Sequence, residues 1–520
     1  MRTWSWLALA AMAGLALPAG AQIRPSADTL VIGQSADAET LDPAAISART
    51  SSNIAQHLWV TLYRVEPDGK IVPYLAESHE TSADGLEHVF KLRGGVTCHD
   101  GEPLTAEDVV YSFKRAADPA NRFTGNTPGF VYSTIKFRDA AVIDDRTMKV
   151  VLGEKTPVAL GLISEVFIHC KGSYERMTLE QAARTPVGSG PYRFVEWVRD
   201  DRIVLEKVEG FALKDVGFRR LVWRTIPEGS TRTAELLAGN VDIITNVSPD
   251  QTERVNASPN ARVQQVAGTR RIYIGFNLKD KFSDTTGGKA IRDPAVRRAL
   301  QYAVDIPTIC EALLRAKCDR ATDLVNPPQG NPELKPYPYE PKTAEALLDQ
   351  AGWPRGRDGT RFELTIQTPN GRYLNDLAVA MAVAQYFSDI GVKTIAQPME
   401  WASVYNPLIR NRDAGPLFLL GAGGATWSAV YDMSLFSSRT SGTNYNNWDD
   451  EEWFSLWPQL NAANTEEERR PIVNRLLKIF HERPPWLLMY FQPDFYGVSN
   501  RIQWQARRDE KIFIEEARLR

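Results

Sequence analysis

Residues 75–115 read LAESHETSADGLEHVFKLRGGVTCHDGEPLTAEDVVYSFKR. Apolar and polar side chains alternate over residues 87–92, and this period of two is typical of a strand that buries one face. A helical pattern follows from Thr105 to Ala116, with Thr105 as its N-cap and two acidic side chains in its first turn, where they favour the helix dipole. A strand followed by a capped helix in one short stretch predicts a mixed α/β fold.

The same mixture of elements continues in both directions along the chain, but its texture changes near residue 270. Up to about that point short strands separated by turns dominate, and we expect them at 29–32, 87–92, 142–152 (a hairpin), 187–195, 203–208 and 221–226, with one more at 272–277. Beyond it helices at 294–305, 342–351, 374–390 and 465–480 alternate with strands at 362–368, 392–396, 418–420 and 486–496. A chain of 520 residues also exceeds what one hydrophobic core usually serves, so we expect two or three domains.

Composition excludes several classes of protein. The 61 Lys and Arg residues nearly balance the 64 Asp and Glu residues, and the net charge of −3 with a pI near 6.2 argues against a nucleic-acid partner. Hydrophobic residues make up 43% and charged residues 24%, which excludes collagen-like, coiled-coil and wholly disordered chains. The mean hydropathy of −0.31, with one strongly apolar run at the N-terminus, excludes a multi-span membrane protein.

Residues 1–21 show the three zones of a cleaved export signal. Arg2 supplies the positive charge, residues 7–17 form an apolar segment too short to span a bilayer comfortably, and Ala-Gly-Ala at 19–21 is a cleavage site. A buried N-terminal helix is the alternative interpretation. No Cys follows the cleavage site, so we expect a soluble periplasmic protein without a lipid anchor.

Export permits disulfides, and the chain has four cysteines. Cys310 and Cys318 lie close enough in the sequence to close a short loop, which would leave Cys98 and Cys170 as the second pair. Four free, buried cysteines are an equally supported alternative. CxxC is absent, so neither a redox motif nor a zinc ribbon is expected.

The common catalytic motifs are missing from the sequence. Gly188-Ser189-Gly190 precedes a proline rather than a helix, so it is not a nucleophile elbow, and none of the six His residues forms an i, i+4 pair. We therefore expect no catalytic residue, no cofactor and no metal site. An exported peptidase or glycosidase remains the alternative, because a glycosidase needs only two carboxylates.

Aromatic residues gather in loops beside Gly and Asn. Clusters occur at 401–405, at 421–431 directly after the apolar strand 418–420, and at 444–448. Flat rings with amide groups suit an enclosed organic ligand, and the C-terminal ends of strands are where open α/β sheets bind ligands. Filling of the core and turns is the alternative role for these aromatic residues.

Residues 75–115 resemble the signature of solute-binding proteins that serve peptide- and nickel-type ABC importers, the solute-binding protein family 5. Further matching segments follow in the same order at 186–192 (PVGSGPY), 274–277 (IGFN), 293–305 (DPAVRRALQYAVD), 344–352 (AEALLDQAG) and 390–393 (IGVK). The likeness covers nearly all of the chain after residue 21.

The resemblance implies a bilobal periplasmic-binding-protein fold of type II, in the large peptide-binding subclass. Lobe I is expected at 22–269 plus 487–520 and lobe II at 270–486, joined by a two-strand hinge. Proteins of this family deliver a ligand to an ABC permease in the inner membrane and perform no chemistry, and we expect a monomer that closes around a peptide or other small organic solute. A binding protein coupled to a chemoreceptor would differ only in its membrane partner.

The resemblance also assigns residues to the ligand site. Trp401 matches a Trp that lines the pocket in oligopeptide-binding relatives, and Thr40-Leu41-Asp42-Pro43 matches a first-lobe loop that faces the cleft. The expected ligand-binding residues are Thr40, Tyr132, Arg372, Trp401, Tyr405, Gly421, Ala422, Gly423, Trp427, Asp432, Tyr445 and Gln492.

One departure from the family pattern concerns the ligand. Peptide-binding members carry an Asp four residues after the Gly that follows the strand 418–420, where it pairs with the peptide ammonium, but here that position is Ala425. Either Asp432 substitutes or the ligand is not an ordinary free peptide, because a buried ammonium without a carboxylate is costly. Arg372 could meet an anionic group, with an exposed surface position as the alternative. Nickel would favour clustered His, and lobe II holds only His481.

Overall fold

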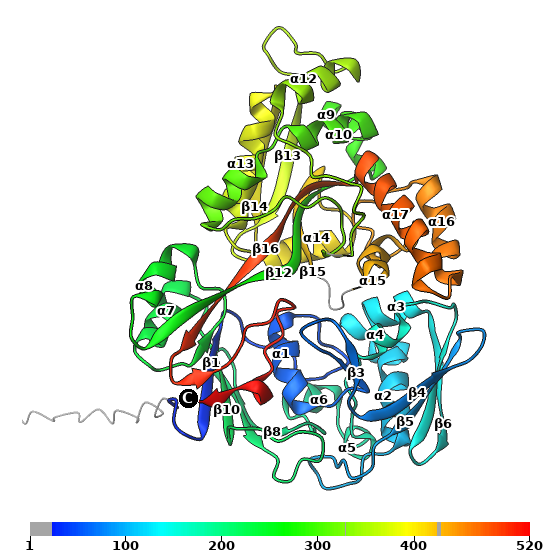
Figure 1. The fold of residues 1–520 in the computed structure, drawn as a ribbon, viewed down its shortest axis with the longest axis vertical. Helices are drawn as coiled ribbons and strands as arrows, with labels where there is room; N and C mark the ends of the chain where they lie inside the picture. Colours follow the sequence, from blue (N-terminus) through cyan, green and yellow to red (C-terminus); the bar gives the residue numbers. More distant parts are fainter. Residues whose placement is uncertain (1–22, 328, 424–427) are drawn as a thin grey trace, which may run out of the picture.

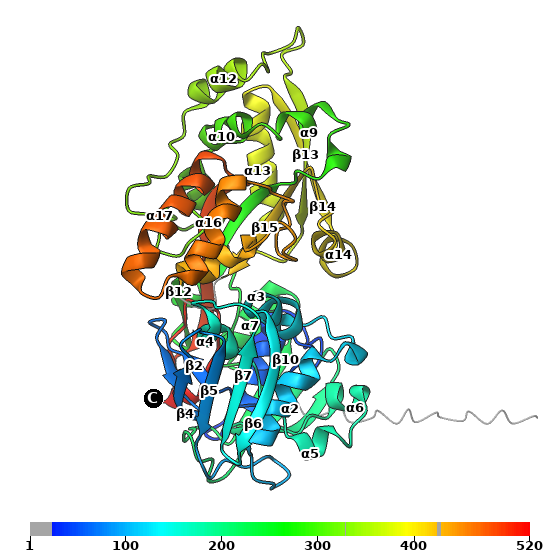
Figure 2. The same cartoon turned by 90° about the vertical axis from the view of Figure 1, so that its right-hand side faces the viewer.

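The computed structural model describes residues 23–327, 329–423 and 428–520, and it has two lobes (Figures 1 and 2). Two long strands, β12 (Ala261–Phe276) and β16 (Trp486–Ser499), run side by side from one lobe into the other. The expected bilobal α/β fold with a two-strand hinge is confirmed. The predicted signal at 1–21 lies outside the described residues. No helix in the described part is long and apolar enough to cross a membrane.

One ten-stranded sheet passes through both lobes, because β12 and β16 pair along most of their lengths. Strands on the lobe II side pair in parallel where β13 meets its two neighbours, and β1 is flanked by parallel strands on the lobe I side. The strand order is β14 (Val392–Met399), β13 (Phe362–Pro369), β15 (Leu417–Gly423), β12, β16, β11 (Ile243–Ile244), β1 (Thr29–Gln34), β10 (Arg220–Thr225), β9 (Arg202–Lys207) and β8 (Tyr192–Val198).

Lobe I carries a second sheet of four strands, in the order β4 (Ala76–Thr81), β5 (Glu87–Leu92), β7 (Thr147–Leu152) and β6 (Phe137–Asp144). Strand β5 covers the predicted 87–92, and its alternate residues His88, Phe90 and Leu92 are buried because successive residues of a strand face opposite sides. The predicted helix follows as α2 (Ala106–Ala117), with Thr105 and Asp108 forming a capping box.

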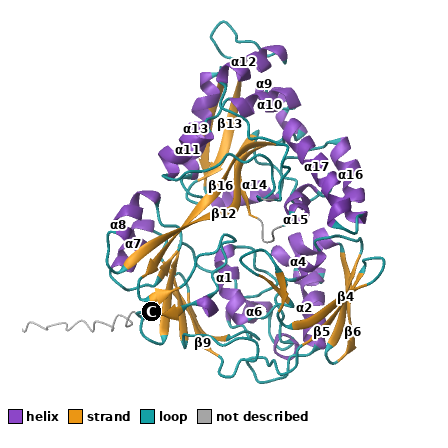
Figure 3. Cartoon of the chain, in the orientation of Figure 1, coloured by secondary structure: helices purple, strands orange, loops and turns teal. Residues whose placement is uncertain are grey.

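Helices cover the sheets on the outside of each lobe (Figure 3). The longest predicted helices appear with small shifts at their ends, whereas α16 was not predicted and contains Pro458. The main helices are α1 (Arg49–Leu58), α7 (Gly229–Leu237), α10 (Pro294–Tyr302), α12 (Pro341–Gln350), α13 (Asp376–Asp389), α14 (Asn406–Arg410), α15 (Ala429–Met433), α16 (Glu451–Ala462) and α17 (Glu466–Glu482).

The pairing of β12 with β16 is interrupted where the two strands pass between the lobes. Ala267 lies opposite Pro493 and Arg271 opposite Phe491, so three residues of β12 face Gln492 alone. Such a bulge bends a strand pair locally. Gly268 lies at this bulge, and a Cβ there would come within 2.5 Å of the carbonyl oxygen of Gln492, so only glycine allows this close approach.

The four cysteines form two disulfides, one between Cys98 and Cys170 in lobe I and one between Cys310 and Cys318 in lobe II. Cys98 and Cys170 lie far apart in the sequence, and their bridge ties the segment before α2 to the residue that precedes the short helix α5 (Lys171–Tyr174).

Candidate functional site

A cavity of about 520 Å³ lies between the lobes and is lined by residues of both. This volume is in the range of small-molecule sites, about 300–1,000 Å³. Lobe I contributes residues from α1, from β2 (Tyr63–Val65), from 125–130 and from the C-terminal segment, including Gln56, Arg64 and Phe513. Lobe II contributes the end of β15 and parts of β12, including Gly421 and Tyr273.

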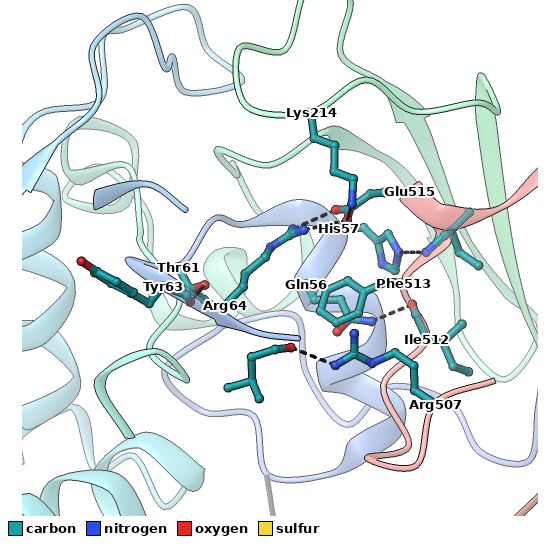
Figure 4. Close-up of polar contacts among 12 residues, drawn as sticks. Gln56, His57, Thr61, Tyr63, Arg64, Lys214, Arg507, Ile512, Phe513 and Glu515 are labelled. Carbon is teal, nitrogen blue, oxygen red and sulfur yellow. Dashed lines mark hydrogen bonds and ion pairs between the residues drawn. The ribbon is translucent and has the colours of Figure 1, made fainter. Parts of the chain in front are cut away.

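The C-terminal segment, which forms part of the lobe I wall, is held by polar contacts with residues 56–64 (Figure 4). Gln56 on α1 donates a hydrogen bond to the carbonyl of Ile512 at 2.7 Å, and Arg64 pairs with Glu515 at 2.7 Å. His57 accepts from the backbone N–H of Ile514 at 3.1 Å through Nε2. Because burial lowers the pKa of His57 to about 4, the ring is neutral and can accept this bond. These contacts fix the C-terminal segment to α1 and to Arg64.

The lobe II wall contains a buried ion pair between Arg271 on β12 and Asp432 on α15, at 2.8 Å. Asp432 is 1% exposed, and its Oδ2 also accepts hydrogen bonds from the backbone N–H and the side-chain amide of Asn326. Burial raises the pKa of Asp432, and Arg271 opposes that shift. The carboxylate of Asp432 is therefore already engaged by the protein.

Arg372 reaches the cavity from a loop whose backbone is pinned. Asp376, the first residue of α13, accepts from the N–H groups of Gly371, Arg372 and Tyr373 at 2.9–3.0 Å. Gln492 of the hinge accepts from the next N–H, that of Leu374, at 3.2 Å. The loop that presents Arg372 is thus attached both to its own helix and to the hinge strand.

A second cluster lies where the hinge meets the cavity. Arg270 on β12 holds Glu510 with two hydrogen bonds of 2.6 and 2.7 Å. Burial favours the protonated form of Glu510, but Arg270 outweighs burial, with help from Arg49 and Arg372, and holds the pKa of Glu510 low. Burial and the neighbouring Glu510 raise the pKa of Asp494. Glu510 is consequently the ionised member of this carboxyl pair at neutral pH.

Positive charge predominates along the cavity wall. Seven described lining residues are cationic, and four of these have an acidic partner within 2.8 Å: Arg64 with Glu515, Arg270 with Glu510, Arg271 with Asp432, and Lys511 with Glu165. The other three are Arg49, Arg372 and Arg410, which form no side-chain hydrogen bond or ion pair with any described residue.

The two lobes touch at the mouth of the cavity, away from the hinge. The ring of Phe130 in lobe I meets the ring of Tyr431 in lobe II edge-on, with centroids 5.6 Å apart. Lys155 of lobe I donates to the carbonyl of Ala462 in lobe II at 3.3 Å. The lobes are therefore in direct contact through these two pairs of residues as well as through the hinge.

Residues 70–444 match the family model of the bacterial extracellular solute-binding proteins, family 5 Middle. The chain belongs to this family. Its members are substrate-binding components of ABC importers, and an exported hydrolase is not supported. Heme-binding protein A of Haemophilus influenzae is 27% identical over 89% of this chain and 86% of its own length. The dipeptide-binding protein of Escherichia coli K12 is 24% identical over 92% of each chain.

Solved structures share the fold of this family 5 protein. The periplasmic binding protein DppA from Helicobacter pylori, in complex with the peptide STSA, superposes with a TM-score of 0.80 and 22% identity, covering 94% of this chain and 98% of that one. At this level of identity the likeness shows the fold alone.

The cavity brings together only part of the ligand site expected for this family 5 protein. Arg372, Gly421, Ala422, Gly423, Asp432 and Tyr445 line it. Thr40, Tyr132, Trp401, Tyr405 and Gln492 are not among its described lining residues. Trp427 and Ala425 lie outside the described residues.

The residues set away from the cavity have structural contacts of their own. Tyr132 and Tyr405 are buried, and their hydroxyls donate to the carbonyls of Phe113 and Leu419. Thr40 accepts from the N–H of Asp42. Trp401 packs on Tyr373 and Tyr405, and the guanidinium of Arg372 lies 5.2 Å from its ring centre.

Sequence reasoning missed most of the cationic wall. Arg49, Arg64, Arg270, Arg271, Arg410 and Lys511 were not expected at the site. The adjacent Arg270 and Arg271, directly before the apolar strand end at 272–276, carried a usable signal, because two arginines beside a buried strand need partners or a ligand.

Proposed function

We propose that this family 5 protein captures its solute in the cavity between the lobes and closes by bending at the β12–β16 bulge. The observation that carries this proposal is a cavity of about 520 Å³ that is lined from both lobes and whose wall includes Arg270 and Arg271 at the β12–β16 bulge. A solute that touches both walls stabilises the closed state in proportion to its preference for that state over the open one.

In this proposal lobe I comprises residues 22–269 and 487–520, and lobe II comprises residues 270–486. The boundary between residues 269 and 270 falls inside the bulge. The boundary between residues 486 and 487 falls at the start of β16, before the bulge residue Gln492. Residues 486–491 pair with the lobe II end of β12, which favours a second crossing near Gln492.

In this proposal the protein releases its solute chemically unchanged. The described cavity wall contains no His and no Cys, and its two acidic residues, Glu165 and Asp432, are each ion-paired. A nucleophile with an adjacent base, the arrangement that covalent hydrolysis needs, is not present among these lining residues. We further propose a monomer without a nucleic-acid partner that is exported through a leader at 1–21 and acts in the periplasm.

The relatives support an organic solute as cargo. Proteins named for heme and for dipeptides are 24–27% identical to this chain along most of its length. The second lobe contains a single His, and no group of three or more metal-binding side chains occurs in the described chain, so a bare metal ion is not the proposed cargo.

Small-angle scattering with thermal denaturation tests the proposal. A solute that raises the melting temperature is expected to reduce the radius of gyration as well, because binding and closure are one event. Ala422→Trp fills the cavity and is expected to abolish both effects, whereas Ala83→Trp on an exposed turn serves as the matched control. Stabilisation that survives Ala422→Trp would place the site elsewhere.

A further inference from the structure

We infer that the cargo is an organic anion without a free ammonium group, whose carboxylate or other oxyanion groups meet Arg372 and Arg410 of lobe II and Arg49 of lobe I. This inference rests on the proposed function, because it assigns chemistry to the same cavity. It concerns the sign of the charge that the cavity selects.

The cavity has more positive charge than the protein neutralises. Four of its seven cations have acidic partners within 2.8 Å, and Arg49, Arg372 and Arg410 have none in the described chain. The whole chain nevertheless has a net charge of −3, so this excess is a local property of the cleft. A cleft of one sign attracts ligands of the opposite sign and raises their rate of association.

Both described acidic residues of this cavity are ion-paired within the protein, and Oδ1 of Asp432, which accepts no hydrogen bond, already lies 2.8 Å from Nη1 of Arg271. Glu165 is bound to Lys511 and Asp432 to Arg271, each at 2.8 Å. Residues 424–427 read Gly-Ala-Thr-Trp and therefore add no acid, wherever they lie. Because an unpaired buried charge costs several kcal/mol, a zwitterionic peptide would bind with its ammonium uncompensated.

Arg372 is positioned to receive an anion. Its backbone N–H and those of its two neighbours are held by Asp376, so that carboxylate is occupied by the loop and is not the partner of the guanidinium. The guanidinium lies 5.0 Å from the ring centre of Tyr373 and 5.2 Å from that of Trp401. Arg372 is half-buried, and this burial lowers the pKa of its guanidinium.

Arginine is suited to this role because its planar fork binds carboxylate and phosphate groups through two parallel hydrogen bonds. Aromatic faces beside the fork keep it in one orientation without neutralising it. Neither Nε nor Nη1 of buried Arg271 makes a hydrogen bond in the described structure; Nη1 lies 2.8 Å from Oδ1 of Asp432, and Nε remains a further donor in the same wall.

The arrangement links anion binding to closure. Arg49 belongs to lobe I and Arg372 to lobe II, and both are near enough to Glu510 to lower its pKa. The carboxylate of Glu510 is held by Arg270, and neither Arg49 nor Arg372 forms a hydrogen bond or ion pair with it. Their mutual repulsion opposes closure, and an anion placed between the lobes removes that repulsion while contacting both walls.

Three matched probes test the sign of the charge: tri-alanine, its N-acetyl derivative and its C-terminal amide. Calorimetry at low salt is expected to rank the N-acetyl peptide, an anion, at or above the free peptide, and the amide, a cation, last. Tricarballylate, which has three carboxylates and no amine, is the fourth probe. Added salt is expected to weaken binding of both anions.

Arg372→Gln is expected to weaken tricarballylate binding by about 30-fold or more, the loss typical of a truncated buried charge pair. Arg372→Lys retains the charge and is expected to recover part of that loss. Arg410→Gln, at an exposed position, provides a second variant that should fold normally, and Arg357→Gln on an exposed loop is the matched control that should bind as the parent does.

The outcomes separate this inference from the proposed function. If the C-terminal amide or another cation closes the lobes and the anions do not, the charge inference is overturned while the binding function stands. If binding of the anions is unchanged in Arg372→Gln and Arg410→Gln, the inference is overturned as well. If no solute of any charge alters the melting temperature or radius of gyration, both proposals fall.

Discussion

Asp432 and Arg271 form a buried ion pair across the lobe II wall of the cleft, with 2.8 Å between Oδ1 and Nη1. The pair satisfies an acid that would otherwise be available to a ligand amine. It also leaves the cleft with an excess of arginine, because Asp432, the first acid after β15 in the sequence, is paired within the protein.

Asp432→Asn is expected to lower the free energy of unfolding by about 3–5 kcal/mol, because it leaves the charge of Arg271 buried without a partner. Urea denaturation measures this loss. The affinity for tricarballylate is expected to stay the same or rise, since the cleft gains positive charge. A complete loss of solute binding in a folded Asp432→Asn protein would instead identify Asp432 as an amine anchor.

Asp42→Asn is expected to cost about 3–5 kcal/mol at neutral pH, because Asp42 and Arg115 form a buried pair at 2.6 Å. Burial alone would raise the pKa of Asp42, but the hydrogen bonds of Arg115 outweigh burial and hold the pKa well below its ordinary 3.8. The pair therefore contributes fully above that value and is lost as the pH falls through the lower folded-state pKa.

Urea denaturation of the parent protein and of Asp42→Asn at several pH values from neutral to strongly acidic checks this pH dependence. The stability difference between the two proteins is expected to shrink on the acidic side. A difference that is constant over the whole range would assign the loss to packing rather than to charge.

Gln492→Ala is expected to weaken solute binding several-fold and to cost about 1–3 kcal/mol of stability, because the N–H of Leu374 loses its acceptor and the loop bearing Arg372 loosens. Gln264→Ala is the matched control: Gln264 on β12 also makes one hydrogen bond through each side-chain atom, to Trp504 and Ala506, at the lobe I end of the strand. Calorimetry compares the solute affinities of Gln492→Ala and Gln264→Ala. Equal affinities of the two variants would mean that Gln492 does not position the loop.

Phe130→Ala is expected to favour the open state, because its edge-on contact with Tyr431 joins the lobes at the mouth of the cleft. An aromatic pair contributes about 0.5–1.5 kcal/mol, so the affinity for solute should fall by roughly 2- to 12-fold. Scattering in the presence of a saturating solute should still show closure. A fall in the melting temperature of the free protein with no change in affinity would restrict Phe130 to a role inside lobe I.

Several elements followed directly from local sequence. The alternation at 87–92 became β5, and Thr105 became the cap of α2, because strand period and helix capping depend on residues a few positions apart. Helix α16 was missed because Pro458 interrupts its pattern, although Asp450 caps it through the N–H of Trp453. The strand expected at 272–277 proved to be one end of the longer β12.

The candidate site was harder to predict, and the aromatic residues show why. Tyr405 and Tyr132 have the residue type expected of a ligand site, yet both hydroxyls are bonded to backbone carbonyls in the core. A sequence pattern records which side chains are available. It does not record which of them the packing of two lobes turns toward a shared space.

The amino-acid sequence by itself determined the mixed α/β texture, the change near residue 270 and the likeness to family 5, since each depends on neighbouring residues or on the order of short segments. Only the tertiary structure decided the charge of the cleft. Arg49, Arg270, Arg372 and Glu510 are distant along the chain and meet because β12 pairs with β16 across both lobes. Which cations keep a partner is settled by these long-range contacts, and no local pattern contains them.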